Sequence, residues 1–133
     1  MEKPLCKSVL CEVSKLEGLP LAYAVGIAED LKIETWHSKS VAVLFQGAPR
    51  AVPWNPHTDW VQGGPIIERE KINTVFGTHE LWSSTKNDLG AKRLEDSFKF
   101  RQYGPTPLIA AMRCYVASKL GEHVEIPEEL LNV

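Results

Sequence analysis

The sequence contains none of the long apolar runs that mark a membrane protein. Its hydrophobic stretches fall well short of the roughly 20 residues needed to cross a bilayer. The first residues, Met1–Pro4, lack the positive start and the apolar run of a secretory signal. We therefore expect a cytoplasmic protein without a membrane partner.

Cysteine is scarce as well, with only 3 residues, Cys6, Cys11 and Cys114. Their odd number and the lack of a C-x-x-C spacing argue against a disulfide scaffold and against a zinc knuckle. The 4 histidines are scattered, and His57 with Asp59 offers only two ligands where a metal site needs three or four. The sequence therefore predicts free thiols and no metal site.

Neither sign of charge dominates, since 15 Lys and Arg residues stand against 17 Asp and Glu residues, for a net charge of −2. Such a chain lacks the long-range attraction that draws most proteins to duplex nucleic acid, so a duplex partner is not expected. A local basic strip keeps a nucleic-acid accessory role open as an alternative, and it consists of Lys92, Arg93, Lys99 and Arg101.

The usual catalytic motifs are also missing. There is no Gly-x-Ser-x-Gly nucleophile elbow, and the segment Gln62–Pro65 lacks the Lys-Ser/Thr of a phosphate-binding Walker loop. Glu68 and Glu70 are two positions apart, so they face different sides of a helix and form no obvious pair. His57 with Asp59 remains as an acid/base pair for a phosphodiesterase-like enzyme. The missing catalytic set favours a non-enzymatic protein without a cofactor.

What the sequence does contain is one helix with both ends marked. Thr106 suits the N-cap, Pro107 the first helical position and Gly121 the residue that ends the helix. Arg113 and Cys114 are expected to point away from the core, which leaves Arg113 to meet water, a carboxylate or an anion. The expected core face consists of residues three or four apart: Leu108, Ile109, Met112, Tyr115, Val116 and Leu120.

The whole chain, residues 1–133, is expected to form a single domain, because it is long enough for one core and short for two. We predict two more helices and a set of short β-branched or aromatic strands. The fold class is therefore α+β, with a small, mostly antiparallel sheet flanked by two or three helices. The further helices are predicted at 16–30 and 58–70, and the strands at 9–13, 33–36, 41–45, 72–76, 80–83 and 96–103.

Four segments depart from these regular patterns. Residues 46–57 hold three prolines and a glycine and predict a rigid loop, while Gly63-Gly64-Pro65 predicts a break or kink in the second helix. Residues 84–95 are polar and predict a flexible connector. Residues 122–133 form an acidic tail, in which a short helix is predicted after Pro127.

Two stretches resemble the signature blocks of the NinX-like phage proteins, a family of unknown function, and of the phage ABA-sandwich domain. They are residues 55–70, NPHTDWVQGGPIIERE, and residues 104–121, GPTPLIAAMRCYVASKLG. A shorter match is Leu16-Glu17-Gly18, where the family has Leu-Thr-Gly, although this chain has Ala22-Tyr23 in place of an Asp-Trp pair. The resemblance spans residues 13–130 and implies a phage or prophage origin and an α/β sandwich. It implies no particular activity.

If the two blocks meet in space, their side chains would form a pocket for a small nucleotide-like ligand. Tryptophans would supply an aromatic wall, glycines a close backbone approach, and arginines and the start of the last helix a site for phosphate. The predicted ligand-binding residues are Trp54, Asn55, Thr58, Asp59, Trp60, Gln62, Gly63, Gly64, Arg69, Thr106 and Arg113.

These features lead to the hypothesis of a phage accessory protein that binds and sequesters a small nucleotide-like molecule. The ligand would be a signal of host immunity in the bacterial cell, which makes the role one of anti-defence. The alternative is a protein-binding inhibitor or adaptor of a host factor, using Trp36, Trp82 and the acidic tail. A homo-oligomer is also expected, because small binding proteins often build pockets across a symmetric interface.

Overall fold

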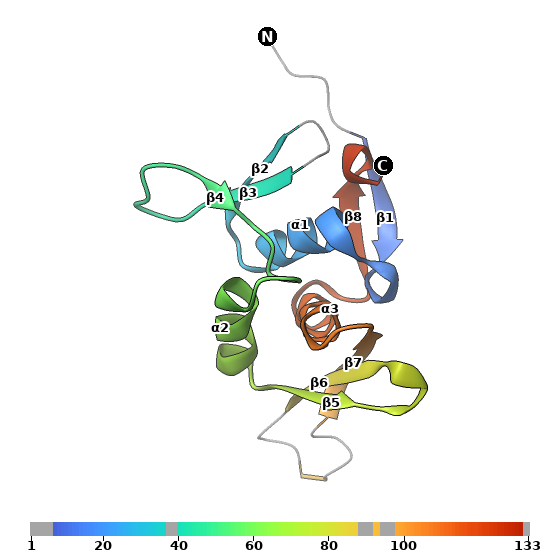
Figure 1. Cartoon of the computed structure of the whole chain (residues 1–133). Coiled ribbons are helices and arrows are strands. Elements are labelled where there is room, and N and C mark those ends of the chain that lie inside the picture. The colour runs from blue at the N-terminus through green and yellow to red at the C-terminus, as the bar shows by residue number, and fades with distance from the viewer. Residues whose placement is uncertain (1–6, 37–39, 88–91, 94–97, 132–133) are drawn as a thin grey trace.

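The computed structural model describes residues 7–36, 40–87, 92–93 and 98–131. The described helices are α1 (Gly18–Ala28), α2 (Trp60–Glu70) and α3 (Pro107–Leu120), and α3 lies at the centre with the other elements around it (Figure 1). Short 3-10 turns are η1 (Val13–Lys15), η2 (Thr78–Glu80) and η4 (Glu128–Leu130). The strands are β1 (Ser8–Glu12), β2 (Lys32–Trp36), β3 (Ser40–Leu44), β4 (Val52–Pro53), β5 (Ile72–Phe76), β6 (Trp82–Asn87), β7 (Phe98–Gly104) and β8 (His123–Pro127).

The predicted α+β class is confirmed, but the described strands form three small sheets instead of one. Their orders are β1-β8, β2-β3-β4 and β5-β6-β7, and every pairing is antiparallel. The predicted neighbours 33–36 and 41–45 are the hairpin of β2 and β3. Each sheet is too small to bury its own apolar face, so all three depend on helices for a core.

Helix α3 supplies more buried apolar side chains to that core than any other described element. Its predicted caps are confirmed: the Thr106 hydroxyl accepts the Ile109 N–H at 3.1 Å, Pro107 opens the helix, and Gly121 ends it at φ 92°. The expectation of a single core face was too narrow, because α3 packs against α1, α2 and all three strands of the β5-β6-β7 sheet. Cys114, expected to point away, is therefore fully buried.

Helix α2 is a single helix from Trp60 to Glu70, so of the predicted break or kink at Gly63-Gly64-Pro65 the break is wrong. Pro65 removes one N–H from the helical ladder, but the neighbouring residues keep their helical conformation around it. Asp59 is the N-cap, since its carboxylate accepts the Val61 N–H at 2.9 Å.

The predicted connector over residues 84–95 begins too early, because Ser84–Asn87 belong to β6. Ser84 and Thr85 are buried in the middle strand of their sheet, paired with β5 on one side and β7 on the other. Residues 88–91, 94 and 95 of that prediction lie outside the described residues.

The acidic tail is also more ordered than its composition indicated. Residues 123–127 form β8 and pair with β1, because Val124 and Ile126 alternate with exposed His123 and Glu125. After Pro127 the predicted helix is a single 3-10 turn, η4.

Candidate ligand-binding cleft

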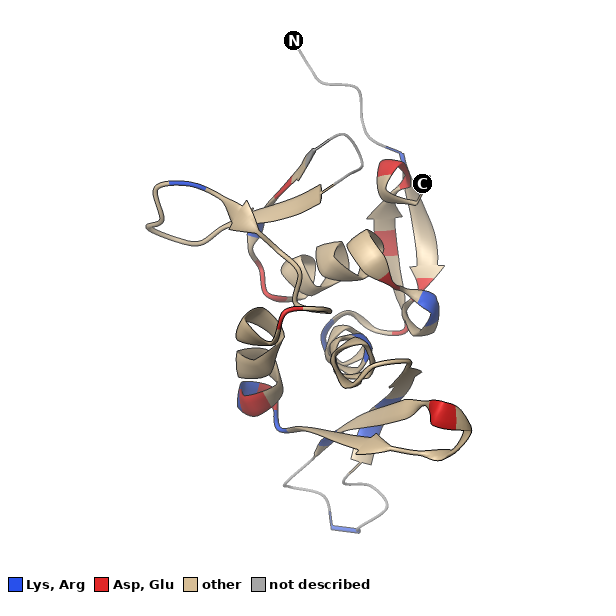
Figure 2. Cartoon of the chain, in the orientation of Figure 1, with Lys and Arg blue, Asp and Glu red and all other residues tan. Residues whose placement is uncertain are grey.

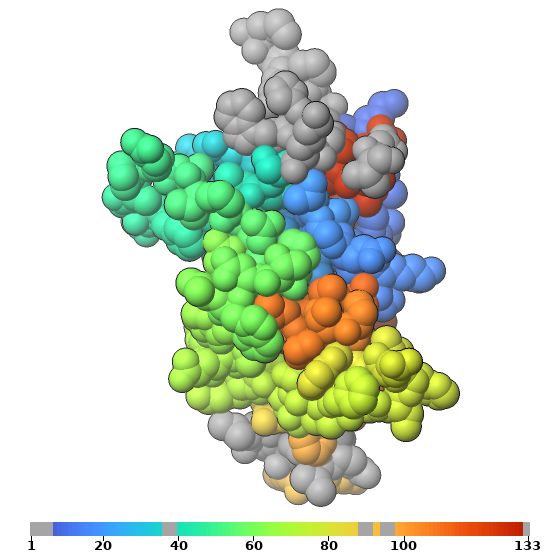
Figure 3. Space-filling view, in the orientation of Figure 1, coloured from blue at the N-terminus to red at the C-terminus, as the bar shows by residue number. Residues whose placement is uncertain are grey.

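The two signature blocks meet in the folded chain, where the start of α2 lies against the start of α3 (Figure 3). The contact is tight. A Cβ placed on Gly63 would lie 2.4 Å from the carbonyl oxygen of Pro56 and 2.7 Å from Cδ2 of Leu108. Gly63 therefore serves helix packing at this point and presents no open surface to a ligand.

Several predicted site residues stabilise the loop that precedes α2. The Gln62 side chain accepts the Asn55 N–H at 2.6 Å and donates to the Pro53 carbonyl at 2.7 Å. The Thr58 N–H donates to the Asn55 carbonyl at 3.1 Å, and Asp59 caps the helix. These polar groups form hydrogen bonds with backbone groups of the loop and helix, so the same atoms are already used within the chain and not for a ligand.

The two tryptophans of this region lie in different environments. Trp54 is 3% exposed and makes an edge contact with Phe45, with ring centroids 6.0 Å apart. Trp60 is 55% exposed, and Gly64 lies beneath it with Cε3 of Trp60 about 4.0 Å from a Cβ built there. Trp60 can therefore offer an aromatic face to a ligand, while Trp54 presents almost no surface.

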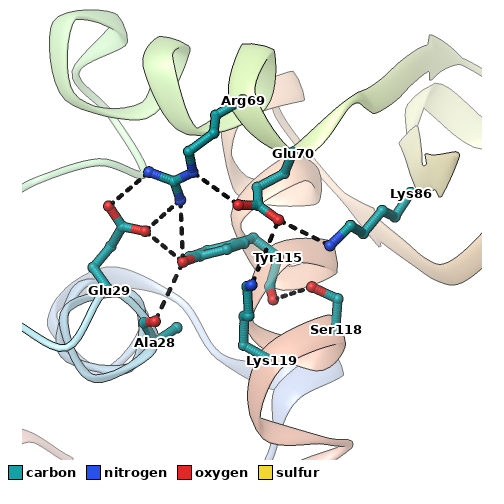
Figure 4. Close-up of polar contacts among 8 residues, drawn as sticks. All are labelled: Ala28, Glu29, Arg69, Glu70, Lys86, Tyr115, Ser118 and Lys119. Atoms are coloured by element: carbon teal, nitrogen blue, oxygen red, sulfur yellow. Dashed lines mark hydrogen bonds and ion pairs between the residues drawn. The ribbon is translucent and has the colours of Figure 1, made fainter.

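Arg69 takes part in an ion-pair network between helices (Figure 4). Its Nη1 and Nη2 lie 3.2 and 2.5 Å from the Glu29 carboxylate, and its Nε lies 2.8 Å from Glu70. Nη2 also donates to the Tyr115 hydroxyl at 3.2 Å. Hydrogen bonding to Glu29, above all, raises the pKa of Arg69, in spite of the opposing effect of burial. A phosphate would have to compete with two carboxylates for this guanidinium.

The same network reaches β6 and α3 through Glu70. Lys86 Nζ lies 2.8 Å from a Glu70 oxygen, and Lys119 Nζ lies 3.8 Å from the same oxygen (Figure 4). Burial raises the pKa of Glu70, but the hydrogen bonds from Lys86 and Arg69 outweigh it and hold that pKa at about 2. Glu70 thus ties the end of α2 to the central helix as a charged carboxylate.

Of the acid/base pair considered for an enzyme, His57 is buried while Asp59 is exposed. His57 is 7% exposed, and burial lowers its pKa. Within the described part of the chain, its Nδ1 atom has no hydrogen-bond partner. The Asp59 carboxylate accepts the Val61 N–H. This geometry gives no support to proton transfer by His57 and Asp59 on a bound substrate.

Arg113 does reach an open cleft, at the other side of α3. Its Nε donates to the Leu16 carbonyl at 2.7 Å and its Nη1 to the Tyr103 carbonyl at 2.6 Å, so the guanidinium is held between η1 and β7. Burial lowers the pKa of Arg113, and the nearby Glu17 carboxylate acts in the opposite direction. Arginine nevertheless stays protonated in proteins, so a positive charge is fixed at the floor of the cleft.

The cleft has a volume of about 310 Å³, at the small end of the range for ligand pockets. Arg101 and Arg113 are its charged groups, and none of the residues lining it is acidic. The lining residues are Ser14, Leu81, Arg101, Gln102, Tyr103, Gly104, Pro105 and Arg113.

Local backbone features place these side chains together. Phe100 has a positive φ of 60° at the bulge between β6 and β7, and Arg101 and Tyr103 follow it. Gly104 then allows β7 to pass close to α3, because a Cβ there would lie 2.8 Å from the Ala110 nitrogen. Sequence reasoning named Arg101 only for a nucleic-acid strip and missed Tyr103, because a bulge is hard to read from the strand pattern.

A larger cleft, of about 740 Å³, lies between β1, the start of α1 and η4. Its walls are mainly apolar, with Leu16, Leu19 and Leu130 among them, and its charged groups are Glu12, Lys15 and Glu17. Lys15 is already paired with Glu12 at 3.2 Å. None of the predicted site residues lines it, and its charge does not suit a phosphorylated ligand.

The comparison with known families decides the identity of the chain. The family described as Bacteriophage P22, NinX matches residues 12–119. The chain belongs to this phage NinX family. The match covers the first signature block and residues 104–119 of the second, which confirms the resemblance to the NinX-like proteins, and the function of the family is unknown. No curated protein matches the chain.

Two further properties concern the described part of this NinX-family chain. None of its helices there has the length and apolar character of a bilayer-spanning segment. Over the same residues, no three His, Cys, Asp or Glu side chains come together as a metal site.

Proposed function

We propose that this NinX-family protein binds a small phosphorylated, nucleotide-like molecule in the Arg101–Arg113 cleft and holds it without chemical change. In a phage-infected bacterium, such binding would sequester a host immune signal and so act against host defence. The observation that carries the proposal is the pair of arginines in a cleft whose lining contains no carboxylate.

Arg113 is held in place before any ligand arrives. Its two hydrogen bonds to backbone carbonyls use two of the five N–H donors of a guanidinium, which leaves three for an anion. Because Arg113 is half-buried, folding has already removed part of the water around its guanidinium. A bound anion would supply hydrogen bonds in place of that lost water. A preorganised donor of this kind binds phosphate without the cost of ordering a long side chain.

Arg101 and Tyr103 supply the more exposed wall. Arg101 donates to the Ser83 hydroxyl at 2.9 Å and can add a second positive charge to a phosphate. Tyr103 is 51% exposed, and its ring can stack on a base. Sequestration is favoured over turnover because the lining offers hydroxyls and guanidinium groups but no histidine or carboxylate to act as a general base.

The test is calorimetric titration with inorganic pyrophosphate, ADP-ribose, a cyclic dinucleotide and duplex DNA. We expect binding of at least one small phosphorylated compound and none of the duplex. Arg101→Ala and Tyr103→Ala should each weaken binding by about tenfold or more, which corresponds to about 1.4 kcal/mol. Arg50→Ala, in the exposed loop between β3 and β4, removes the same charge elsewhere and should leave binding unchanged.

Two outcomes decide the proposal. Chromatography of the ligand released by denaturing the complex should return it intact, whereas a cleaved product would indicate an enzyme. An Arg101→Ala protein that binds as well as the wild type, or a wild type that binds none of the compounds at millimolar concentration, would rule out this cleft.

The adaptor alternative has one observation in its favour. The aromatic patch formed by Phe76 and Trp82 lies on the β5-β6-β7 sheet, where Phe76 is 56% exposed and packs edge-on against Trp82 with ring centroids 5.2 Å apart. Exposed aromatic patches often mark protein-binding surfaces. The side chain of Trp36 lies outside the described residues.

A pull-down from host lysate separates this alternative from ligand binding. A partner that depends on this patch should be captured by the wild type and by Val61→Ser, which changes an 82% exposed valine on α2, but not by Phe76→Ser. Equal capture by both variants would exclude the patch as the binding surface.

A further inference from the structure

Strand β1 has one edge without a partner strand. It pairs with β8 along its whole length, and their sheet contains no third strand in the part of the chain that the structure describes (Figure 1). An open edge presents backbone N–H and C=O groups that can bond to another strand.

The hydrogen bonds at the two ends of the β1-β8 pair determine which residues of β1 point their backbone groups away from β8. The Val13 N–H donates to the Glu122 carbonyl at 2.9 Å, and the Glu128 N–H donates to the Lys7 carbonyl at 2.7 Å. The register between them is regular from Ser8↔Pro127 to Glu12↔His123. In an antiparallel pair alternate residues point their backbone groups at the partner, so the odd-numbered residues face β8. The N–H and C=O groups of Ser8, Leu10 and Glu12 therefore face outward.

The side chains of this edge are unusually apolar for an open strand. Leu10 is 60% exposed and Val9 is 39% exposed. The strand contains no proline or lysine, which commonly protect an open edge from pairing, and its one charged residue, Glu12, stands at its end. The acidic residues coloured near this edge are those of β8 and η4 and Glu12 at the end of β1 itself (Figure 2). From β8, the Glu125 carboxylate accepts a hydrogen bond from the Ser8 hydroxyl at 2.9 Å.

We propose that β1 pairs with β1 of a second copy of the chain, antiparallel and centred on Leu10, to form a homodimer with a continuous four-stranded sheet. In this register Ser8 of each copy lies opposite Glu12 of the other. The three outward residues of each strand then exchange six backbone hydrogen bonds across a two-fold axis. The proposal does not depend on the ligand cleft.

This register is favoured over its neighbours by pairing and by charge. It pairs all five residues of β1 with β1 of the other copy. The neighbouring registers with the same outward residues are centred on Val9 or on Cys11, and each of them pairs only three residues of the strand. Glu12 faces a serine, so no like charges are directly opposed. Leu10 packs against Leu10 on the solvent face, and Val9 packs against Cys11 on the other. The 3-10 turn at Val13 ends the strand and limits the interface to this segment.

Sedimentation or light scattering over a concentration series tests the dimer. An interface of one short strand from each copy is small, so we expect association at about micromolar concentration or above. The measured mass should rise from 14.9 kDa towards twice that value. Leu10→Lys should keep the protein monomeric at every concentration, because it places two like charges side by side. Val61→Lys makes the same change at an exposed position on α2 and should dimerise as the wild type does.

Hydrogen exchange supplies a readout that follows the strand register. The amides of Leu10 and Glu12 should become protected as the concentration rises, while those of Val9 and Cys11 are protected by β8 at all concentrations. Leu10→Lys should abolish only the first effect, which also shows that the variant is folded. A wild type that stays monomeric at about 0.5 mM, or a dimer that survives Leu10→Lys, would overturn the proposal.

Discussion

Gly63 and Leu108 are the point at which the two signature blocks touch. A Cβ added to Gly63 would come within 2.7 Å of Leu108 Cδ2 and 2.4 Å of the Pro56 carbonyl oxygen. The leucine side chain can adjust, but the carbonyl belongs to a fully buried proline on the loop before α2. The close approach of α2 to α3 therefore requires a residue without a side chain at position 63.

The first prediction follows from this contact. Gly63→Ala should lower the free energy of unfolding by about 1–3 kcal/mol, because overpacking against backbone cannot be relieved by a change of rotamer. Gly64→Ala is the matched control, since the nearest atom to its new Cβ is Trp60 Cε3 at 4.0 Å. That control should raise stability by up to about 1 kcal/mol through helix propensity. Urea unfolding of both variants makes the comparison, and equal effects would contradict the packing argument.

A second prediction concerns the hydroxyl of Tyr115. It donates to the Glu29 carboxylate, accepts from Arg69 Nη2 at 3.2 Å, and lies 3.3 Å from the Ala28 carbonyl. Tyr115→Phe should cost about 1–3 kcal/mol in thermal or urea unfolding, because the partly buried Glu29 carboxylate loses a donor. Tyr103→Phe changes an exposed tyrosine and should stay within about 0.5 kcal/mol of the wild type. Similar losses in the two variants would show that the network adds little.

How far the sequence predicts the fold depends on how far apart the interacting residues lie along the chain. The caps of α3 could be predicted because Thr106, Pro107 and Gly121 act on their own helix. The contact of Gly26 with Ile33, 2.9 Å from a built Cβ to Ile33 Cδ1, shows a close approach of α1 to β2 whose partner the sequence does not identify. The pairing of β1 with β8 was not predicted, because the two strands are far apart in the sequence. The Ser8 hydroxyl and the Glu125 carboxylate to which it donates, for example, are 117 positions apart.

The candidate site shows the same limit more strongly. Asp59, Gln62 and Asn55 were named for a ligand because their side chains are polar, but polar side chains before a helix also serve as caps and loop supports. Arg113 was named correctly as an arginine that leaves the apolar face of its helix. The arrangement of Arg101 and Tyr103 beside it depends on a bulge and on Gly104, which no spacing rule specifies.

A third prediction concerns Cys114, which is fully buried against β6 and the core. Burial raises its pKa to about 12, in spite of the opposing charge of Lys86, so almost none of it is thiolate near pH 8. Iodoacetamide should modify Cys114 only when the protein unfolds, and mass spectrometry of peptides gives its rate separately. The partly exposed Cys11 is the internal control and should react faster. Fast modification of Cys114 in native protein would contradict its burial.

The last prediction is the loss of stability in acid through Glu70. The hydrogen bonds from Lys86 and Arg69 overcome burial and hold the pKa of Glu70 at about 2 in the folded chain, against 4.5 for an unperturbed glutamate side chain. A folded pKa below the unfolded one stabilises the protein above the unfolded value, and this contribution is lost as pH falls from about 4.5 to about 2. Its size is on the order of 2–3 kcal/mol.

Glu70→Gln removes the group that titrates, so its stability should change less than that of the wild type between pH 5 and pH 2, measured by urea unfolding at each pH. At pH 7 the same variant should be less stable than the wild type, because Lys86 and Lys119 lose their anionic partner. Glu68→Gln removes an exposed carboxylate two positions away on α2 and should keep the wild-type dependence on pH. If both variants retained the full acid-dependent loss, the stabilising charge would lie elsewhere, since Glu70 would then make no contribution that protonation can remove.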